Sequence, residues 1–89
     1  MVVLLTGCSY SYREKAIDKR YTKLNNKLDK LMDDEIEESD RAQLEEQYEE
    51  FISGMTEYKE ANPKKNTLYL DKYIEASKRK LGYLKDIKD

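Results

Sequence analysis

Apolar residues recur at helical spacing in three segments of the chain. Within each segment, successive apolar positions lie four, three, four and three residues apart, which places them on one face of an α-helix. The pattern predicts helices at about 12–38, 40–61 and 67–87, separated by polar stretches. We call these positions the apolar stripes, with Ser77 as the one polar member: Ile17, Tyr21, Leu24, Leu28 and Leu31; Leu44, Tyr48, Phe51, Met55 and Tyr58; Leu70, Ile74, Ser77, Leu81 and Leu84.

The three stripes fit one another as antiparallel neighbours. Residues that face each other in an antiparallel hairpin have a nearly constant sum of sequence numbers. The numbers of Leu31 and Leu44 have the same sum as those of Ile17 and Tyr58. The second and third stripes match in the same way. The first half of the middle segment is acidic and its neighbours are basic, which also favours this packing. The predicted fold is all-α, a small antiparallel up-down-up three-helix bundle over residues 12–89.

The polar stretch between the first two stripes decides whether they belong to one helix or two. Residues 33–40 are mostly acidic, and no stripe position lies between Leu31 and Leu44. A break is the simpler interpretation, with Asp40 and Gln43 forming a capping box at the start of the second helix. The alternative is a long helical hairpin in which one continuous helix covers 12–61. Pro63 marks the second boundary, because proline lacks an N–H and disfavours helical geometry in the preceding residue.

Two glycines lie inside predicted helices, where each costs about 1 kcal/mol relative to alanine. The hairpin pairing places Gly82 opposite Tyr48, and we expect it to form a notch for the tyrosine ring. Gly54 is expected near Ala76, where it would allow close approach of two helices.

The first eleven residues differ in composition from the rest of the chain. A short apolar run ends at Leu5-Thr6-Gly7-Cys8, which contains the only cysteine. This tetrapeptide resembles the lipobox of bacterial lipoprotein precursors. The resemblance implies transfer of a diacylglycerol to the Cys8 sulfur, cleavage between Gly7 and Cys8, and acylation of the new amino terminus. Ser9 does not carry the aspartate signal for inner-membrane retention, so the resemblance implies the outer membrane in a Gram-negative cell.

The resemblance also divides the chain into parts. Residues 1–7 correspond to a residual signal peptide, and residues 8–11 to the lipid-anchor cysteine and its tether. A full signal peptide has a basic region and an apolar region of about 7–15 residues, so we interpret the leader as truncated. The alternative is an ordinary buried N-terminal segment. The apolar run at residues 1–5 is too short for a bilayer, which needs ~20 residues.

The composition of the chain excludes several classes of catalytic and binding site. The chain is 40% charged with a net charge of -2, and it contains no histidine and no tryptophan. Histidine-dependent catalysis and Cys/His zinc sites are therefore excluded, and bulk attraction to nucleic acid is not expected. The acidic run at 33–40 lacks the alternating ligands and central glycine of an EF-hand loop. We expect no enzyme activity, no metal, no cofactor, no nucleic-acid partner and no small-molecule substrate.

Tyrosine is unusually frequent, with eight residues in the chain. Tyr21, Tyr48 and Tyr58 belong to the apolar stripes, where their rings can pack while their hydroxyls reach water. Other tyrosines lie off the stripes, and tyrosine is enriched at binding surfaces. The sequence thus predicts a partner-binding face that includes Tyr69, Tyr73 and Tyr83.

These observations lead to two functional hypotheses. The first is a small membrane-anchored bacterial lipoprotein of the cell envelope, attached through acyl chains on Cys8, with a non-catalytic helical domain that contacts another envelope or surface protein. The second is a cytosolic helical protein-interaction module in the cytoplasm, without lipidation. In the second hypothesis residues 1–8 are a plain N-terminus.

Overall fold

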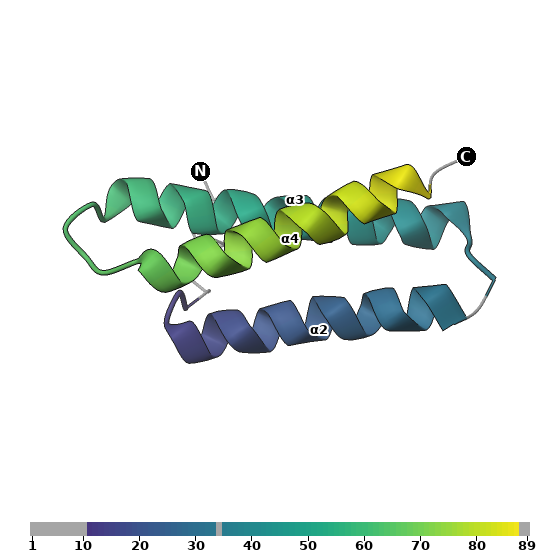
Figure 1. Cartoon of the computed structure of the whole chain (residues 1–89), viewed down its shortest axis with the longest axis horizontal. Helices are drawn as coiled ribbons and strands as arrows, with labels where there is room; N and C mark the ends of the chain where they lie inside the picture. The colour runs from purple at the N-terminus through teal and green to yellow at the C-terminus, as the bar shows by residue number, and fades with distance from the viewer. Residues whose placement is uncertain (1–10, 34, 88–89) are drawn as a thin grey trace, which may run out of the picture.

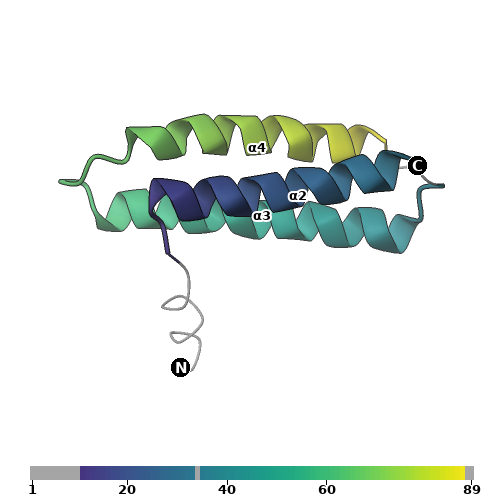
Figure 2. The same ribbon diagram turned by 90° about the horizontal axis from the view of Figure 1, so that it is seen from below.

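The computed structural model describes residues 11–33 and 35–87, and these residues form three helices. The helices are α2 (Glu14–Asp33), α3 (Glu38–Ala61) and α4 (Leu68–Asp86). Each of the three packs against the other two, and α3 and α4 are the most closely associated pair. Figures 1 and 2 show α3 running antiparallel to both α2 and α4. The predicted all-α, up-down-up three-helix bundle is confirmed.

The core consists of two clusters along the bundle, both built from stripe positions. One cluster contains Ile17, Phe51, Met55, Leu70 and Ile74. The other cluster contains Leu28, Leu44, Tyr48 and Leu84. Burying an aliphatic or aromatic side chain of this size stabilises the fold by about 1.5–3 kcal/mol. The remaining stripe tyrosines and leucines are half-buried at the edges of these clusters.

The connection between α2 and α3 corrects two expectations. Helix α2 ends at Asp33 instead of reaching residue 38, and residues 35–37 are not helical. A continuous helix over 12–61 is therefore wrong. Most of a helix's stability in a protein comes from packing of its apolar face, and the side chain in this stretch that could pack, Ile36, is 39% exposed. Helix α2 therefore ends soon after its last stripe residue, Leu31.

The start of α3 also differs from the expected capping box. The helix begins at Glu38, the N-cap position is Glu37 in an extended conformation, and no side chain caps it. Asp40 lies inside the first turn, so its pairing with Gln43 as a capping box is wrong. The helix begins earlier because Arg41 pairs with Glu38 across the first turn at 2.7 Å. Acidic residues in this turn also interact favourably with the helix dipole.

Helix α3 ends at Ala61, close to the boundary that Pro63 predicted. Asn62 closes the helix, since its backbone N–H and its side-chain amide both donate to the carbonyl oxygen of Tyr58. After a turn, α4 begins at Leu68, within one residue of the expected position.

The expectation for Gly82 is wrong, and the nearest neighbour of Gly54 is a residue that the sequence did not indicate. A Cβ atom built at Gly82 meets no atom within 4 Å, so this glycine forms no notch for Tyr48. Tyr48 is fully buried elsewhere in the core, and its hydroxyl donates to Asn25 Oδ1 at 2.6 Å. A Cβ atom at Gly54 meets the hydroxyl of Tyr12 at 2.7 Å. The constant sum of sequence numbers predicts the position of a residue along the bundle axis. It does not predict toward which neighbouring helix the residue points.

Candidate functional site

The point where the chain enters the bundle is held in place by Tyr12. The Tyr12 ring stacks on the Tyr58 ring, with centroids 4.7 Å apart and planes inclined by 16°. The hydroxyl of Tyr69 donates a hydrogen bond to the main-chain carbonyl of Tyr12. The small surface of Gly54 leaves room for the Tyr12 hydroxyl. The beginning of the described chain is thereby attached to both α3 and α4.

The guanidinium of Arg20 completes this junction from α2. Its Cζ atom lies 4.8 Å from the centroid of the Phe51 ring and 5.9 Å from that of Tyr12. A guanidinium over an aromatic face is attracted by the ring quadrupole. Residues from all three helices therefore converge where the chain enters.

Two of the three tyrosines predicted to bind a partner connect α4 to the N-terminal part of the molecule. Tyr69 is half-buried and bonds to Tyr12, as described above. Tyr73 is half-buried as well, donates to Asp18 Oδ1 at 2.8 Å, and meets the Tyr21 ring edge-on at 5.4 Å. Tyr83 alone of the three is exposed, at 45%. The structure therefore does not bring the three together as one exposed face, and partner binding by them stays a prediction.

The surroundings of Tyr69 and Tyr73 favour their protonated forms. Burial, followed by the hydrogen bond with Asp18, raises the pKa of Tyr73 to about 12. Burial also raises the pKa of Tyr69. Both hydroxyls thus act as hydrogen-bond donors at neutral pH, consistent with the bonds they make to α2 and to Tyr12.

Tyr83 borders a groove of about 640 Å³ between α2 and α4. Leu28, Met32 and Tyr83 supply apolar surface, and Met32 is 37% exposed. Arg79 and Lys80 add two positive charges to the lining, and Asp29 adds one negative charge. The groove therefore offers apolar surface beside a small excess of positive charge.

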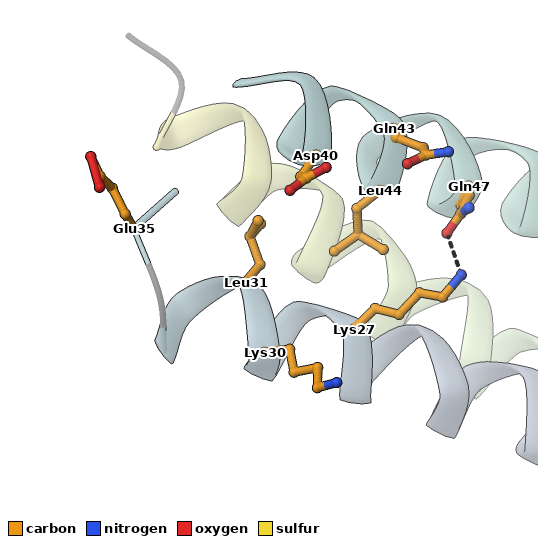
Figure 3. A pocket seen from close by; sticks show the side chains of 8 residues that line it. All are labelled: Lys27, Lys30, Leu31, Glu35, Asp40, Gln43, Leu44 and Gln47. Atoms are coloured by element: carbon orange, nitrogen blue, oxygen red, sulfur yellow. Dashed lines mark hydrogen bonds between the residues drawn. The ribbon is translucent and has the colours of Figure 1, made fainter. Parts of the chain in front are cut away.

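A second groove, of about 320 Å³, lies between α2 and α3 (Figure 3). Leu31 and Leu44 point into it, and Lys27 Nζ donates to Gln47 Oε1 across it at 3.2 Å. Lys27, Lys30, Glu35 and Asp40 on its lining carry balanced charges. No single sign of charge therefore predominates in this groove.

Arg41 is a buried charged residue that the predicted apolar stripes did not include. It is 2% exposed, and its Nε and Nη2 atoms donate to the Glu38 carboxylate at 2.9 and 2.7 Å. Its Nη1 atom donates to Glu45 Oε1 at 2.5 Å and to the carbonyl oxygen of Leu84 at 3.1 Å. The hydrogen bonds with Glu38 and Glu45 raise the pKa of Arg41. One sequence signal was present: Arg41 lies three residues before Leu44 and continues that stripe.

The predicted lipid-attachment residue, Cys8, lies outside the described residues, as do residues 1–7. Within 11–33 and 35–87, no group of three or more acidic or cysteine side chains is arranged to hold a metal ion. None of the helices in that same part of the chain has the length and apolar character needed to cross a bilayer.

Comparison of this chain with protein-family models, with curated proteins and with solved structures finds no match. Functional proposals therefore depend on the residues and on the geometry described above.

Proposed function

We propose that this protein is a small membrane-anchored bacterial lipoprotein whose helical bundle is a non-catalytic domain that contacts another envelope or surface protein. The observation that carries the proposal is Leu5-Thr6-Gly7-Cys8, in which the only cysteine follows two small residues and an apolar run. In this proposal Cys8 bears the acyl chains, and residues 9–11 link it to the bundle. Stable anchoring requires two or three chains, because one chain binds membranes only marginally.

The short segment between Cys8 and Tyr12 limits the distance between a lipid anchor on Cys8 and the bundle. Cys8 and Tyr12 are four residues apart, and a chain of that length spans at most about 14 Å. Tyr12 is itself fixed on Tyr58 and Tyr69. A lipid on Cys8 would consequently hold the bundle close to the bilayer. The tether reaches less than half the length of α3, which has 24 residues and is about 36 Å long.

The groove between α2 and α4 is the surface that we assign to the protein partner. Tyr83 and Met32 are exposed there, and Arg79 lies beside them. Aromatic residues, methionine and arginine are the types enriched in protein interfaces. Within the predicted tyrosine face, Tyr83 is the residue that a partner reaches without displacing a hydrogen bond seen in the fold.

Metabolic labelling tests the lipoprotein proposal. Cells that encode the protein are grown with radioactive palmitate, and the wild type is compared with Cys8→Ser. We expect label on the wild-type protein in the membrane fraction and none on the variant. A wild-type protein in the soluble fraction with the mass of an unmodified thiol would overturn the proposal. That result would favour the alternative, a cytosolic interaction module that uses the same groove.

A further inference from the structure

The turn between α3 and α4 forms a protruding tip with an unusual combination of exposed residues. Figure 2 shows that this turn extends beyond the first turn of α2. Leu68, which follows the turn, is 74% exposed, whereas Met32, Ile36 and Tyr83 are 37–45% exposed. Lys64 and Lys65 are exposed beside it. We call Lys64, Lys65 and Leu68 the bundle tip.

The bundle tip is in direct contact with the residues that fix the start of the chain. The Nζ atom of Lys65 lies 5.8 Å from the centroid of the Tyr58 ring, and that ring stacks on Tyr12. Tyr69, the neighbour of Leu68, donates to the carbonyl of Tyr12. Tyr12, the residue to which a tether would connect, therefore lies beside the tip.

We propose that the bundle tip contacts the anionic surface of the bilayer that carries the lipid on Cys8. This inference rests on the proposed function. Lysine ammonium groups are attracted to lipid phosphates, and an adjacent exposed leucine gains by entering the interface. The tip thus adds a second point of membrane contact to the covalent anchor and orients the bundle.

The opposite end of the bundle has the charge that this orientation requires. The turn between α2 and α3 lies at the far end in Figure 1. It carries Glu35, Glu37, Glu38 and Asp40, all of them exposed. Lys30 and Arg41 offset part of this charge, but residues 30–41 still hold six acidic side chains against two basic ones. An anionic surface therefore repels this end and attracts the tip. Both ends therefore favour the same orientation, with α4 rising from the membrane at Leu68.

The tether makes the tip contact effective. One leucine and two lysines give only weak binding to a bilayer when the protein is free in solution. Attachment at Cys8 converts this binding into an intramolecular event, for which a short linker supplies an effective concentration on the order of millimolar.

The chain offers a clean spectroscopic test because it contains one cysteine and no tryptophan. The full chain with Leu68→Trp is coupled through Cys8 to a maleimide lipid in vesicles of phosphatidylcholine and phosphatidylglycerol, and coupling is verified by mass. Ile36→Trp at the opposite end is the matched control. We expect emission from Leu68→Trp to move to shorter wavelength and to be quenched by lipids brominated on their acyl chains. Emission from Ile36→Trp is expected to stay unquenched.

Charge variants test the role of the lysines in the Leu68→Trp background. Lys64→Gln with Lys65→Gln is expected to lower the ratio of inserted to free tip by roughly 30-fold. Lys78→Gln with Arg79→Gln removes the same charge about 15 Å further along α4, beyond the Debye length of about 8 Å. That control is expected to retain insertion. Equal loss in both variants, or identical behaviour of the two tryptophans, would overturn the inference.

This test separates the inference from the proposed function. The maleimide supplies the anchor whether or not cells acylate Cys8, so a negative palmitate result does not decide the vesicle result. A labelled protein whose Leu68→Trp variant stays in an aqueous environment on vesicles would retain the lipoprotein proposal and reject the tip contact.

Discussion

Arg41, in the first turns of α3, donates a hydrogen bond from Nη1 to the main-chain carbonyl of Leu84, near the end of α4, at 3.1 Å. The last four carbonyl groups of a helix lack partners within the helix, so Arg41 satisfies one of them from a neighbouring element. Glu38 and Glu45 hold the guanidinium from within α3. The start of α3 and the end of α4 are thereby connected by one side chain.

Replacing Arg41 tests this connection. Arg41→Met keeps an unbranched apolar stem and leaves the Leu84 carbonyl without its partner. We expect the melting temperature to fall by roughly 5–10 °C, the change that losing such a hydrogen bond makes in a domain of this size. Thermal unfolding followed by far-UV circular dichroism measures the effect. Arg79→Met, at an exposed position of α4, is the control and should change stability little.

Ser77 offers a stabilising substitution. The residue is fully buried, and its Oγ atom has no hydrogen-bond partner in the described part of the chain. Ser77→Ala removes a desolvated hydroxyl and adds helix propensity, so it should raise the free energy of unfolding by about 1–2 kcal/mol. Urea unfolding gives the value. Ser53→Ala, exposed on α3, gains propensity alone, and an equal gain at both positions would contradict the role of burial.

The two helical glycines should respond oppositely to alanine. Gly82→Ala meets open space and should stabilise the protein by about 1 kcal/mol. Gly54→Ala places a methyl group against the Tyr12 hydroxyl, so its propensity gain should be offset by displacement of the stacked ring. In a Tyr12→Phe background the hydroxyl is gone, and Gly54→Ala should recover its gain. A double-mutant cycle in urea measures this coupling; independent, additive effects would contradict the contact.

Stability should decrease at alkaline pH. The ordinary pKa of tyrosine is 10.0, and Tyr73 is raised to about 12 in the fold. Between these values the unfolded chain releases its proton first, so stability is fully present below pH ~10 and is lost as the pH rises toward ~12. The urea midpoint measured across this range should fall less steeply in Tyr73→Phe than in the wild type. Tyr83→Phe, which removes an exposed hydroxyl from the same helix, is the matched control.

The apolar stripes predicted the fold because helix packing is governed by a simple period. Every large residue of the two buried clusters was a stripe position, from Ile17 to Leu84. Pro63 also placed the second turn correctly, since its covalent geometry acts locally. Features that depend on backbone chemistry or on the period of one helix can therefore be predicted from the sequence alone.

The surroundings of Tyr12, Gly82 and Arg41 could not be obtained in this way. They depend on the rotation of each helix about its own axis. The pairing of residues by their sequence numbers does not determine this rotation. Tyr12 precedes α2, and its position follows from stacking on Tyr58. Arg41 lies three residues before Leu44 and so has the spacing of the stripe. A pattern of hydrophobic residues does not include it because its guanidinium is charged. The Asp40 capping box failed because an ion pair within α3 moved the helix start.

The stacking of Tyr12 on Tyr58 determines how mechanical force enters the molecule. A pull applied from the amino-terminal side of Ser11 is taken up first by the Tyr12 ring and its carbonyl, and so by α3 and α4, the most closely associated helices. Helix α2 is thereby shielded from being peeled off the bundle. In a chain held from its amino-terminal side, a load on the domain would therefore be carried first by α3 and α4.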